Sequence, residues 1–321
     1  MRLPLRMGAF ADAATIVIAE PCQTSFAKEA TMNAVHTPTA SAMSPRERLL
    51  ELMQVSERQI ELAGIPTSVL EAGTGPAMIL LHGPGEYAAK WLRVIPDLAS
   101  THHVVAPDLP GHGASGGVED ADADRIVAWL AALIDQTCEA KPALVGQILG
   151  GAIAARFAID HGDRLTRLVL VDALGLRPFE PAPEFAAAFG AFLQAPTEAT
   201  HDALWRQCAF DLDVMRRQMG ESWRSIKAYN LERAHASNLR ATQHRLMEIF
   251  GMPAIAPADL ARIGVSTTLI WGRHDRATPP GVAQEASDRY GWPLRIIENA
   301  GDDPPMEQPL AFVAALRETP R

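Results

Sequence analysis

The chain alternates short, mainly apolar runs with longer segments in which apolar residues recur at helical spacing. Apolar runs without polar alternation are typical of strands that are buried on both faces of a sheet. Such runs occur at Met78–Leu81, His103–Ala106, Pro142–Val145 and Leu168–Val171. Helical patterns between them cover Tyr87–Leu98, Ala123–Cys138 and Leu149–His161. Strands that alternate with helices in this way predict a doubly wound, mostly parallel sheet.

The alternation of strands and helices stops after the run that ends at Val171. Residues 176–262 contain few β-branched residues and show long helical patterns, at Glu184–Leu193, Thr200–Met219 and Ser222–Met247. Further strands are predicted at Arg58–Leu62, Ser68–Ala72, Ser266–Trp271 and Leu294–Ile297, and a final helix at Met306–Leu316. The pattern therefore predicts an eight-stranded sheet with a helical cap inserted after the sixth strand. The predicted core has two parts, residues 45–175 and 263–321.

The N-terminal residues have a different character. Residues 1–44 show no steady period and are rich in Ala, Thr, Ser and Pro, which predicts a disordered leader. A start of the protein at Met32 or Met43 is the alternative. A secretory signal is the weaker interpretation. Arg2 and Arg6 precede a modest apolar stretch, Ala14–Ala19, but Asp12 interrupts the apolar character of this region and no cleavage site follows cleanly.

Composition and charge narrow the class of protein. The 321 residues are 48% hydrophobic and 21% charged, as in an ordinary globular protein, and the net charge is −9. Without a basic stripe the sequence predicts no nucleic-acid partner, and its apolar runs are too short for a membrane span. Cys22, Cys138 and Cys208 are scattered, which favours a reducing, cytoplasmic location over a disulfide framework. No cofactor and no metal are predicted.

One turn has the form of a catalytic motif without its nucleophile. The segment Gly146-Gln147-Ile148-Leu149-Gly150 follows an apolar strand and opens a helix rich in small residues. This is the strand–turn–helix setting of the G-x-S-x-G nucleophile elbow. Ile148 stands where that motif has serine, and no other G-x-S-x-G occurs in the chain.

Three further motifs, together with this turn, resemble the capped α/β-hydrolase fold. They are His82-Gly83 after an apolar strand, the segment 108–113 (Asp-Leu-Pro-Gly-His-Gly), and the segment 271–275 (Trp-Gly-Arg-His-Asp). The resemblance covers roughly residues 56–318 and is closest to the branch of meta-cleavage-product hydrolases, lactonases and epoxide hydrolases. It implies a Ser or Asp nucleophile, a late acid, a final His and an oxyanion hole of two backbone N–H groups.

When the family's catalytic positions are carried over one by one, most of them fall on residues of a different type in this sequence. The acid falls on Asp275, which is present, but the nucleophile falls on Ile148 and the histidine on Asp302. Isoleucine has no lone pair, so no acyl-enzyme can form there. One oxyanion donor falls on Pro84, which has no N–H, and the other is the amide of Leu149. Classical serine hydrolysis is therefore not expected.

The acids offer a different chemistry. If the fold is right, Asp275 and Asp302 face each other, and repulsion together with lost hydration should raise one pKa so that the pair shares a proton. Such a pair can act as a general acid or base. It could instead hold a divalent cation with Asp303, Glu86 or Glu307, although no metal-ligand spacing is present. The alternative is that Asp302 and Asp303 point into solvent at a loop tip.

The remaining expectations concern the ligand. Ile148 is predicted to complete an apolar pocket floor. The other pocket residues are predicted to be His82, Gly83, Glu86, Gln147, Trp205 and Trp223. The expected ligand is a small apolar or aromatic molecule, and assembly as a homodimer is left open. Three functions follow: an enzyme of proton-transfer, lyase or isomerase type, a non-catalytic ligand-binding protein, or a hydrolase with an unrecognised nucleophile or metal-activated water.

Overall fold

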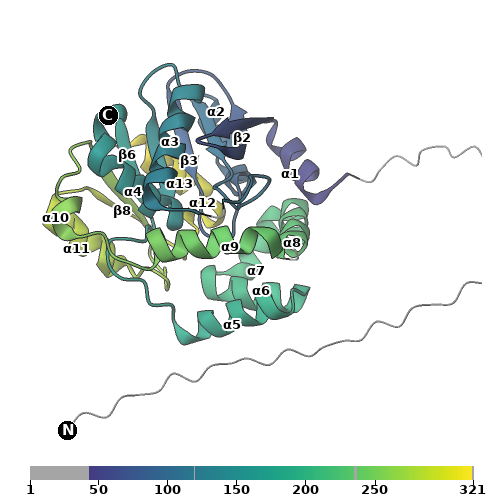
Figure 1. Ribbon diagram of the computed structural model, residues 1–321. Helices are drawn as coiled ribbons and strands as arrows, with labels where there is room; N and C mark the ends of the chain where they lie inside the picture. Colours follow the sequence, from purple (N-terminus) through teal and green to yellow (C-terminus); the bar gives the residue numbers. More distant parts are fainter. Residues whose placement is uncertain (1–42, 119, 235–236, 320–321) are drawn as a thin grey trace, which may run out of the picture. The chain divides into compact units, whose positions relative to one another are not determined.

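The computed structural model describes residues 43–118, 120–234 and 237–319, and their strands form one sheet (Figure 1). The strand order is β1-β2-β4-β3-β5-β6-β7-β8. Only the β1–β2 and β2–β4 pairs are antiparallel, and all other pairs are parallel. The strands are β1 (Ser56–Leu62), β2 (Ile65–Ala72), β3 (Ala77–Leu81), β4 (His103–Pro107), β5 (Ala143–Gln147), β6 (Arg167–Val171), β7 (Thr267–Gly272) and β8 (Leu294–Ile297). The predicted eight-stranded, mostly parallel sheet is confirmed. The predicted leader lies almost entirely outside the described residues.

Each central strand contributes to two cores, one on each face of the sheet. In β3, Ile79 and Leu81 join one cluster while Met78 and Leu80 join the other. Side chains of a strand point alternately to its two faces, so a continuous apolar run buries both. The helices that flank the sheet are α1 (Pro45–Met53), η1 (Ala88–Arg93), α2 (Ile95–Ala99), α3 (Ala123–Thr137), α4 (Leu149–His161), η2 (Gly162–Arg164), α10 (Pro257–Leu260), α11 (Pro280–Tyr290), α12 (Pro304–Glu307) and α13 (Pro309–Arg317).

A helical insertion lies between β6 and β7, where the sequence predicts the cap. Its elements are α5 (Pro183–Gln194), α6 (Glu198–Cys208), α7 (Leu212–Met219), α8 (Glu221–Ala234), α9 (Ser237–Leu246) and a π-helical turn, η3 (Met247–Gly251). In Figure 1 the green helices α5 to α8 gather on one side of the strands. The single helix predicted at Thr200–Met219 is wrong, because it is divided into α6 and α7, whereas residues 235–236 of the helix predicted at Ser222–Met247 lie outside the described residues. Asp211 begins a new helix, α7, by accepting a hydrogen bond from the N–H of Val214 (2.9 Å).

Three further helical segments differ from the prediction, and in each a proline lies in the first turn of an observed helix. The helix predicted at Tyr87–Leu98 is a 3-10 helix followed by α2, and Pro96 lies in the first turn of α2. The helix predicted at Met306–Leu316 is divided in the same way, with Pro309 beginning α13. Helix α11 was not predicted, although Pro280 at its start and Gly291 (φ 71°) at its end are usual signals.

The first helix joins the sheet to the insertion. Arg46 of α1 lies 2.9 Å from Asp108, a fully buried carboxylate, and 2.7 Å from Glu57. Arg46 also donates a hydrogen bond to the hydroxyl of Tyr229 in α8 (3.3 Å). Asp108 also accepts from the backbone amides of Ala114, in its own loop, and of Ala88, in η1. The ion pair with Arg46 therefore holds α8 against the loop that follows β4.

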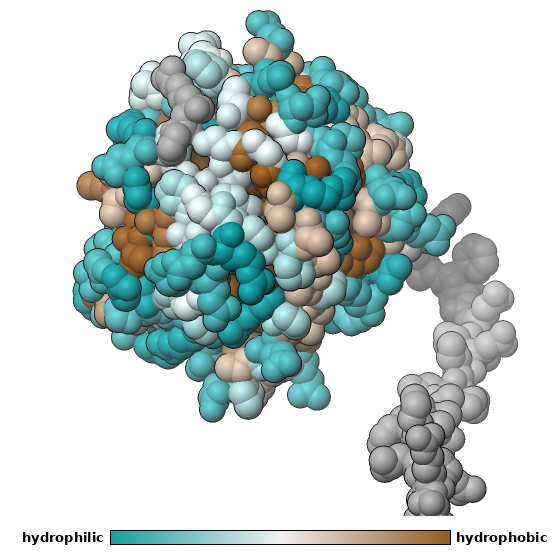
Figure 2. Space-filling model, turned by 90° about the vertical axis from the view of Figure 1, so that its left-hand side faces the viewer, coloured by the Kyte–Doolittle hydropathy of each residue, from teal (hydrophilic) through white to brown (hydrophobic). Residues whose placement is uncertain are grey.

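The surface carries apolar residues in small groups. Figure 2 shows one face on which brown residues are separated by hydrophilic ones. In the described part of the chain, the large apolar side chains with the highest exposed fractions are Leu310 (76%) and Leu52 (50%). Within the same residues, every helix falls short of the length and apolar character that crossing a membrane requires.

Glycine allows helix α4 to approach the sheet at the turn that contains Ile148. A Cβ on Gly146 would lie 2.3 Å from the carbonyl oxygen of Gly150, and a Cβ on Gly150 would lie 2.4 Å from that of Leu81. Backbone atoms cannot yield to such a contact without a shift of the whole helix. The turn therefore depends on these two glycines.

Replacing Gly146 by alanine should destabilise the protein by about 2–4 kcal/mol, because the new methyl group overlaps backbone. The matched control is Gly281→Ala in α11, where a Cβ would meet nothing within 4 Å. There the change should be neutral or stabilising by about 0.5–1 kcal/mol. Urea denaturation measures both, and equal effects of the two substitutions would contradict the close approach.

Candidate active site

The turn between β5 and α4 holds Ile148 in a backbone conformation that side chains rarely adopt. Its φ is 48° and its ψ is −106°, which for a β-branched residue costs roughly 1–3 kcal/mol. Its N–H donates to the carbonyl of Val171 (3.0 Å), and its carbonyl accepts from the N–H of Leu174 (3.1 Å). The surrounding structure therefore maintains the strained turn around a side chain that has no polar atom.

A carboxylate lies beside this turn, on the loop after β3. The N–H of Gly83 donates to Oε2 of Glu86 (2.8 Å). A Cβ on Gly83 would lie 2.8 Å from Oε2 of Glu86 and 3.3 Å from Cδ1 of Ile148. Both side chains therefore lie against the same glycine, and the following residue, Pro84, offers no N–H.

Lys90 connects this loop to the loop after β8. Its ammonium group contacts Glu86 closely and lies 3.1 Å from Oδ2 of Asp303. Gln147, the last residue of β5, donates from Nε2 to Oδ1 of Asp303 (3.2 Å) and to the carbonyl of Asp302 (3.0 Å). One lysine and one amide thus fix the acidic loop against the ends of the central strands.

Asp302 is buried, and its pKa is raised to about 7. Burial is the main cause, and the charge of Asp275 adds to it, while the ammonium of Lys90 acts in the opposite direction. The alternative that Asp302 and Asp303 point into solvent is wrong, because these residues are only 8% and 1% exposed. The carbonyl of Cys208, the last residue of α6, accepts from the N–H of Asp302 (3.4 Å) and helps to cover it.

Asp275, which follows β7, belongs to a carboxyl group pair that the sequence reasoning missed. Its Oδ1 accepts from the N–H groups of Ala277 (2.7 Å) and Thr278 (2.9 Å), and the Thr278 hydroxyl contacts Oδ2. Burial nevertheless raises its pKa to about 6. The second acid is Asp172, directly after β6, whose fully buried carboxyl accepts a hydrogen bond from the N–H of Gly272 (2.9 Å) and interacts electrostatically with Asp275.

Burial and the charge of Asp275 raise the pKa of Asp172 well above its usual range. Its position directly after the apolar run Leu168–Val171 was a signal for a site residue, because parallel strands end at the same edge of the sheet. Three acids, Asp172, Asp275 and Asp302, therefore influence one another where two were predicted.

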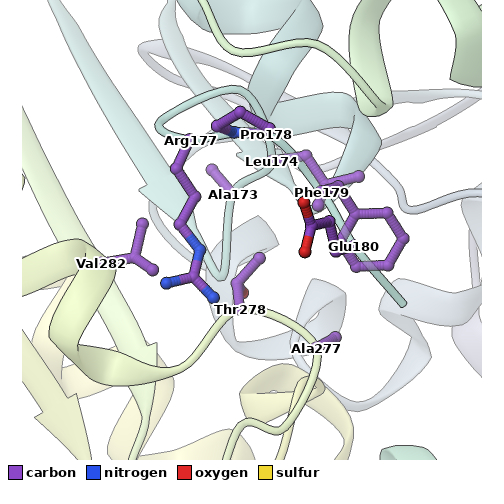
Figure 3. A pocket seen from close by; sticks show the side chains of 9 residues that line it. All are labelled: Ala173, Leu174, Arg177, Pro178, Phe179, Glu180, Ala277, Thr278 and Val282. Atoms are coloured by element: carbon purple, nitrogen blue, oxygen red, sulfur yellow. The ribbon is translucent and has the colours of Figure 1, made fainter. Parts of the chain in front are cut away.

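A small hollow opens beside this acid group (Figure 3). Thr278 and Ala173 lie at its inner end, and the side chains of Arg177 and Glu180 extend into it from the loop after β6. It leaves about 10 Å³ for the centre of a water-sized molecule, roughly the room that one water needs. The hollow is therefore too small for a substrate.

The insertion is attached to the acidic loop by Glu307 of α12. This carboxyl group accepts from the N–H of Phe210 (2.6 Å), between α6 and α7, and from the N–H of Gly301 (2.7 Å). Burial, followed by the charge of Asp303, raises its pKa to about 8. The Phe210 ring also stacks on His274 at 4.2 Å. The segment between α6 and α7 is thus held over Asp302 in this structure.

Not all residues predicted for the pocket lie together. Gly83, Glu86, Gln147, Ile148 and Asp302 lie in the connected contacts described above. Trp205 and Trp223 instead pack edge to face at 5.0 Å, next to His201 inside the insertion.

Two further predictions concern His82 and a metal ion. The ring nitrogens of His82 bond to the carbonyl of Gly83 (2.7 Å) and to the N–H of Leu109 (3.0 Å), and burial lowers its pKa to about 3. This ring is neutral and fixes the two loops. Among the described residues, no group of three or more His, Cys, Asp or Glu is arranged to hold a metal ion.

Comparison with known proteins places this site in a family context. Residues 78–316 match the Alpha/beta hydrolase family. The chain is 30% identical over 233 residues to the 2-hydroxy-6-oxo-2,4-heptadienoate hydrolase of Pseudomonas putida, covering 69% of this chain and 80% of that one. It is 31% identical to the 2-hydroxymuconate semialdehyde hydrolase of Pseudomonas sp. strain CF600, over 69% of this chain and 78% of that one.

A solved structure supports the same relationship. The 2-hydroxy-6-oxo-6-phenylhexa-2,4-dienoate hydrolase of Rhodococcus sp. strain RHA1 superposes with a TM-score of 0.72 and 26% identity. The superposition covers 83% of this chain and 98% of that one. The similarity thus includes both the sheet and most of the helices around it.

The raised pKa values make the stability of the protein depend on pH. A carboxyl whose pKa is higher in the folded state binds more protons there, so its contribution is favourable at low pH and is lost as pH rises. For Asp302, with a pKa of about 7, the loss falls between about pH 4 and pH 7. Asp302→Asn should therefore raise the free energy of unfolding at pH 8 by an amount on the order of 2 kcal/mol.

The measurement is urea denaturation of both proteins between pH 5 and pH 8. Asp163→Asn, at an exposed position, is the matched control and should leave the pH dependence unchanged. An Asp302→Asn protein with the same pH slope as wild type would show that Asp302 titrates normally.

Proposed function

Because the chain belongs to the Alpha/beta hydrolase family, we propose that it is an enzyme of that family which transfers protons with Asp302 and Asp275 instead of using a serine nucleophile. The proposed substrate is a small, mainly apolar molecule. One observation carries the proposal: the buried Asp302 carboxyl, under the influence of Asp275, has a pKa of about 7. A general acid or base is most effective when its pKa lies near the working pH.

The strained turn supports the absence of a covalent step. Residue 148 adopts the positive φ of a nucleophile elbow, and the family resemblance places the serine there, but the side chain is aliphatic. An acyl-enzyme needs an attacking heteroatom. Pro84 and the bond from Gly83 to Glu86 also leave the predicted oxyanion corner without free donors from that loop.

The three acids support a division of roles. The amides of Ala277 and Thr278 stabilise Asp275 as a carboxylate, while burial and the charge of Asp275 raise the pKa of Asp172. The negative charge of Asp275 then favours the protonated form of Asp302. In the proposed reaction Asp302 gives its proton to one substrate atom and takes a proton from another, so the enzyme returns to its starting state. Isomerisation and lyase-type cleavage fit this scheme.

A non-catalytic role in ligand binding is the second candidate. The contacts of Cys208 and Phe210 with the loop that carries Asp302 favour it, because they cover the acid. Burying several acids in a cleft costs free energy, however, which an apolar binding site would avoid. For that reason the enzymatic role is preferred.

Substitution of either acid separates the two candidates. Asp302→Asn and Asp275→Asn should each lower turnover about 100-fold or more, because proton transfer by a placed carboxyl contributes that much. The assay is conversion of a substrate identified by screening small aromatic and aliphatic ketones, lactones and enols. The exposed variant Asp163→Asn should retain full activity. Turnover that survives both acid substitutions would exclude the proposed chemistry, whereas binding of the screened compounds without any turnover by the wild-type protein would favour the binding role.

A further inference from the structure

We propose that residues 208–211, which join α6 to α7, form a lid over Asp302, and that Glu307 is the positioning residue that holds this lid closed. The inference rests on the proposed function only in giving Asp302 a substrate to meet. It adds the movement that admits the substrate, which the proton-transfer scheme does not specify.

The lid lies directly against the loop that carries Asp302. A Cβ on Gly301 would lie 2.2 Å from the carbonyl oxygen of Cys208 and 3.0 Å from the amide nitrogen of Phe210. The N–H of Asp302 donates to the same carbonyl of Cys208 (3.4 Å). Backbone therefore covers backbone at this point, and Asp302 beneath it is buried. In the proposed scheme the lid moves away before a substrate contacts the acid.

Glu307 connects the two sides of this contact through its two carboxyl oxygens. Oε1 accepts from the N–H of Gly301 (2.7 Å), on the acidic loop, and Oε2 accepts from the N–H of Phe210 (2.6 Å), on the lid. Glu307 is buried while both bonds are made. Opening of the lid exchanges only the bond to Phe210 for bonds to water, so this bond acts as the latch. The stacking of the Phe210 ring on His274 adds a contact at the surface.

The insertion is loosely packed on the side that leads into the lid. His201 is the one buried residue of α6, and Phe192 is the one buried residue of α5, both helices being wholly described. Helix α7, on the other side of the lid, buries Leu212, Met215 and Met219. Elements with few buried apolar contacts are the first to open locally. We therefore expect the end of α6 to move with the lid while α7 stays in place.

Hydrogen exchange of backbone amides, followed by NMR at pH 7, measures the opening. The amide of Asp302 is the reporter, because its acceptor belongs to the lid and its bond does not involve Glu307. The amides of β5, in the centre of the sheet, are the reference for global unfolding. In the wild type the Asp302 amide should exchange at least about tenfold faster than those of β5. Equal rates would overturn the proposal, because the lid would then open only when the whole protein unfolds.

Variants at residue 307 test the latch. Glu307→Ala should accelerate exchange of the Asp302 amide, relative to β5, by at least about tenfold, because a hydrogen bond to a charged group is lost. Glu307→Gln places an NH₂ group against one of the two backbone donors and should act in the same direction, even if Glu307→Ala proves unstable. The control is Glu285→Gln, at an exposed position of α11, which should leave the ratio unchanged. An unchanged ratio in a folded Glu307 variant would contradict the role of this residue.

Alkylation by iodoacetamide, located by mass spectrometry, gives an independent readout. Burial, followed by the charge of Asp302, raises the pKa of the Cys208 thiol well above its usual range, so the closed lid keeps it unreactive. In Glu307→Ala, Cys208 should react at least about tenfold faster relative to Cys138, the half-buried cysteine after α3. General loosening of the fold would accelerate both cysteines, and an unchanged ratio would contradict the lid. Neither measurement uses a substrate, so the lid and the proton transfer by Asp302 can each fail alone.

Discussion

The close packing of helix α4 on the ends of the parallel strands is the constraint on which the site depends. Glycine at 146 and 150 lets backbone approach backbone, and residue 148 between them adopts a positive φ. In a hydrolase such strain can be related to function, because it presents the nucleophile. Here the same backbone carries isoleucine at residue 148. The proposed function therefore assigns the chemistry to the neighbouring acids.

The electrostatics of the site follow from burial more than from any single pair. Acids from the ends of β6 and β7 and from the loop after β8 meet in a poorly solvated region. Hydrogen bonds from backbone amides favour ionisation of Asp275, whereas burial and the charge of Asp275 raise the pKa of Asp172. Asp302 lies between these extremes, because the ammonium of Lys90 partly offsets its burial. A graded set of acids of this kind can hold and release one proton near neutral pH.

The sequence predicted the sheet and the place of the insertion, because continuous apolar runs and a long helical segment are strong patterns. It misjudged the helices of the insertion, where short caps such as Asp211 decide the ends. Asp302 was found through the family resemblance. Asp172 was missed because no pattern along the chain shows that it lies near Asp275, which is about one hundred residues away and follows the neighbouring strand. The contact between Glu86 and Gly83 likewise depends on the side-chain geometry of a single loop.

The pKa of Asp302 is the most direct measure of the proposed mechanism. NMR titration of ¹³C-labelled aspartate carboxyl groups, with Asp302→Asn to identify the signal, gives this pKa in the folded protein. The account predicts a value near 7 in the wild type and a lower one in Asp275→Asn, where the neighbouring charge is removed. An Asp302 that titrates near its ordinary value of about 4, with or without the Asp275 charge, would contradict the account.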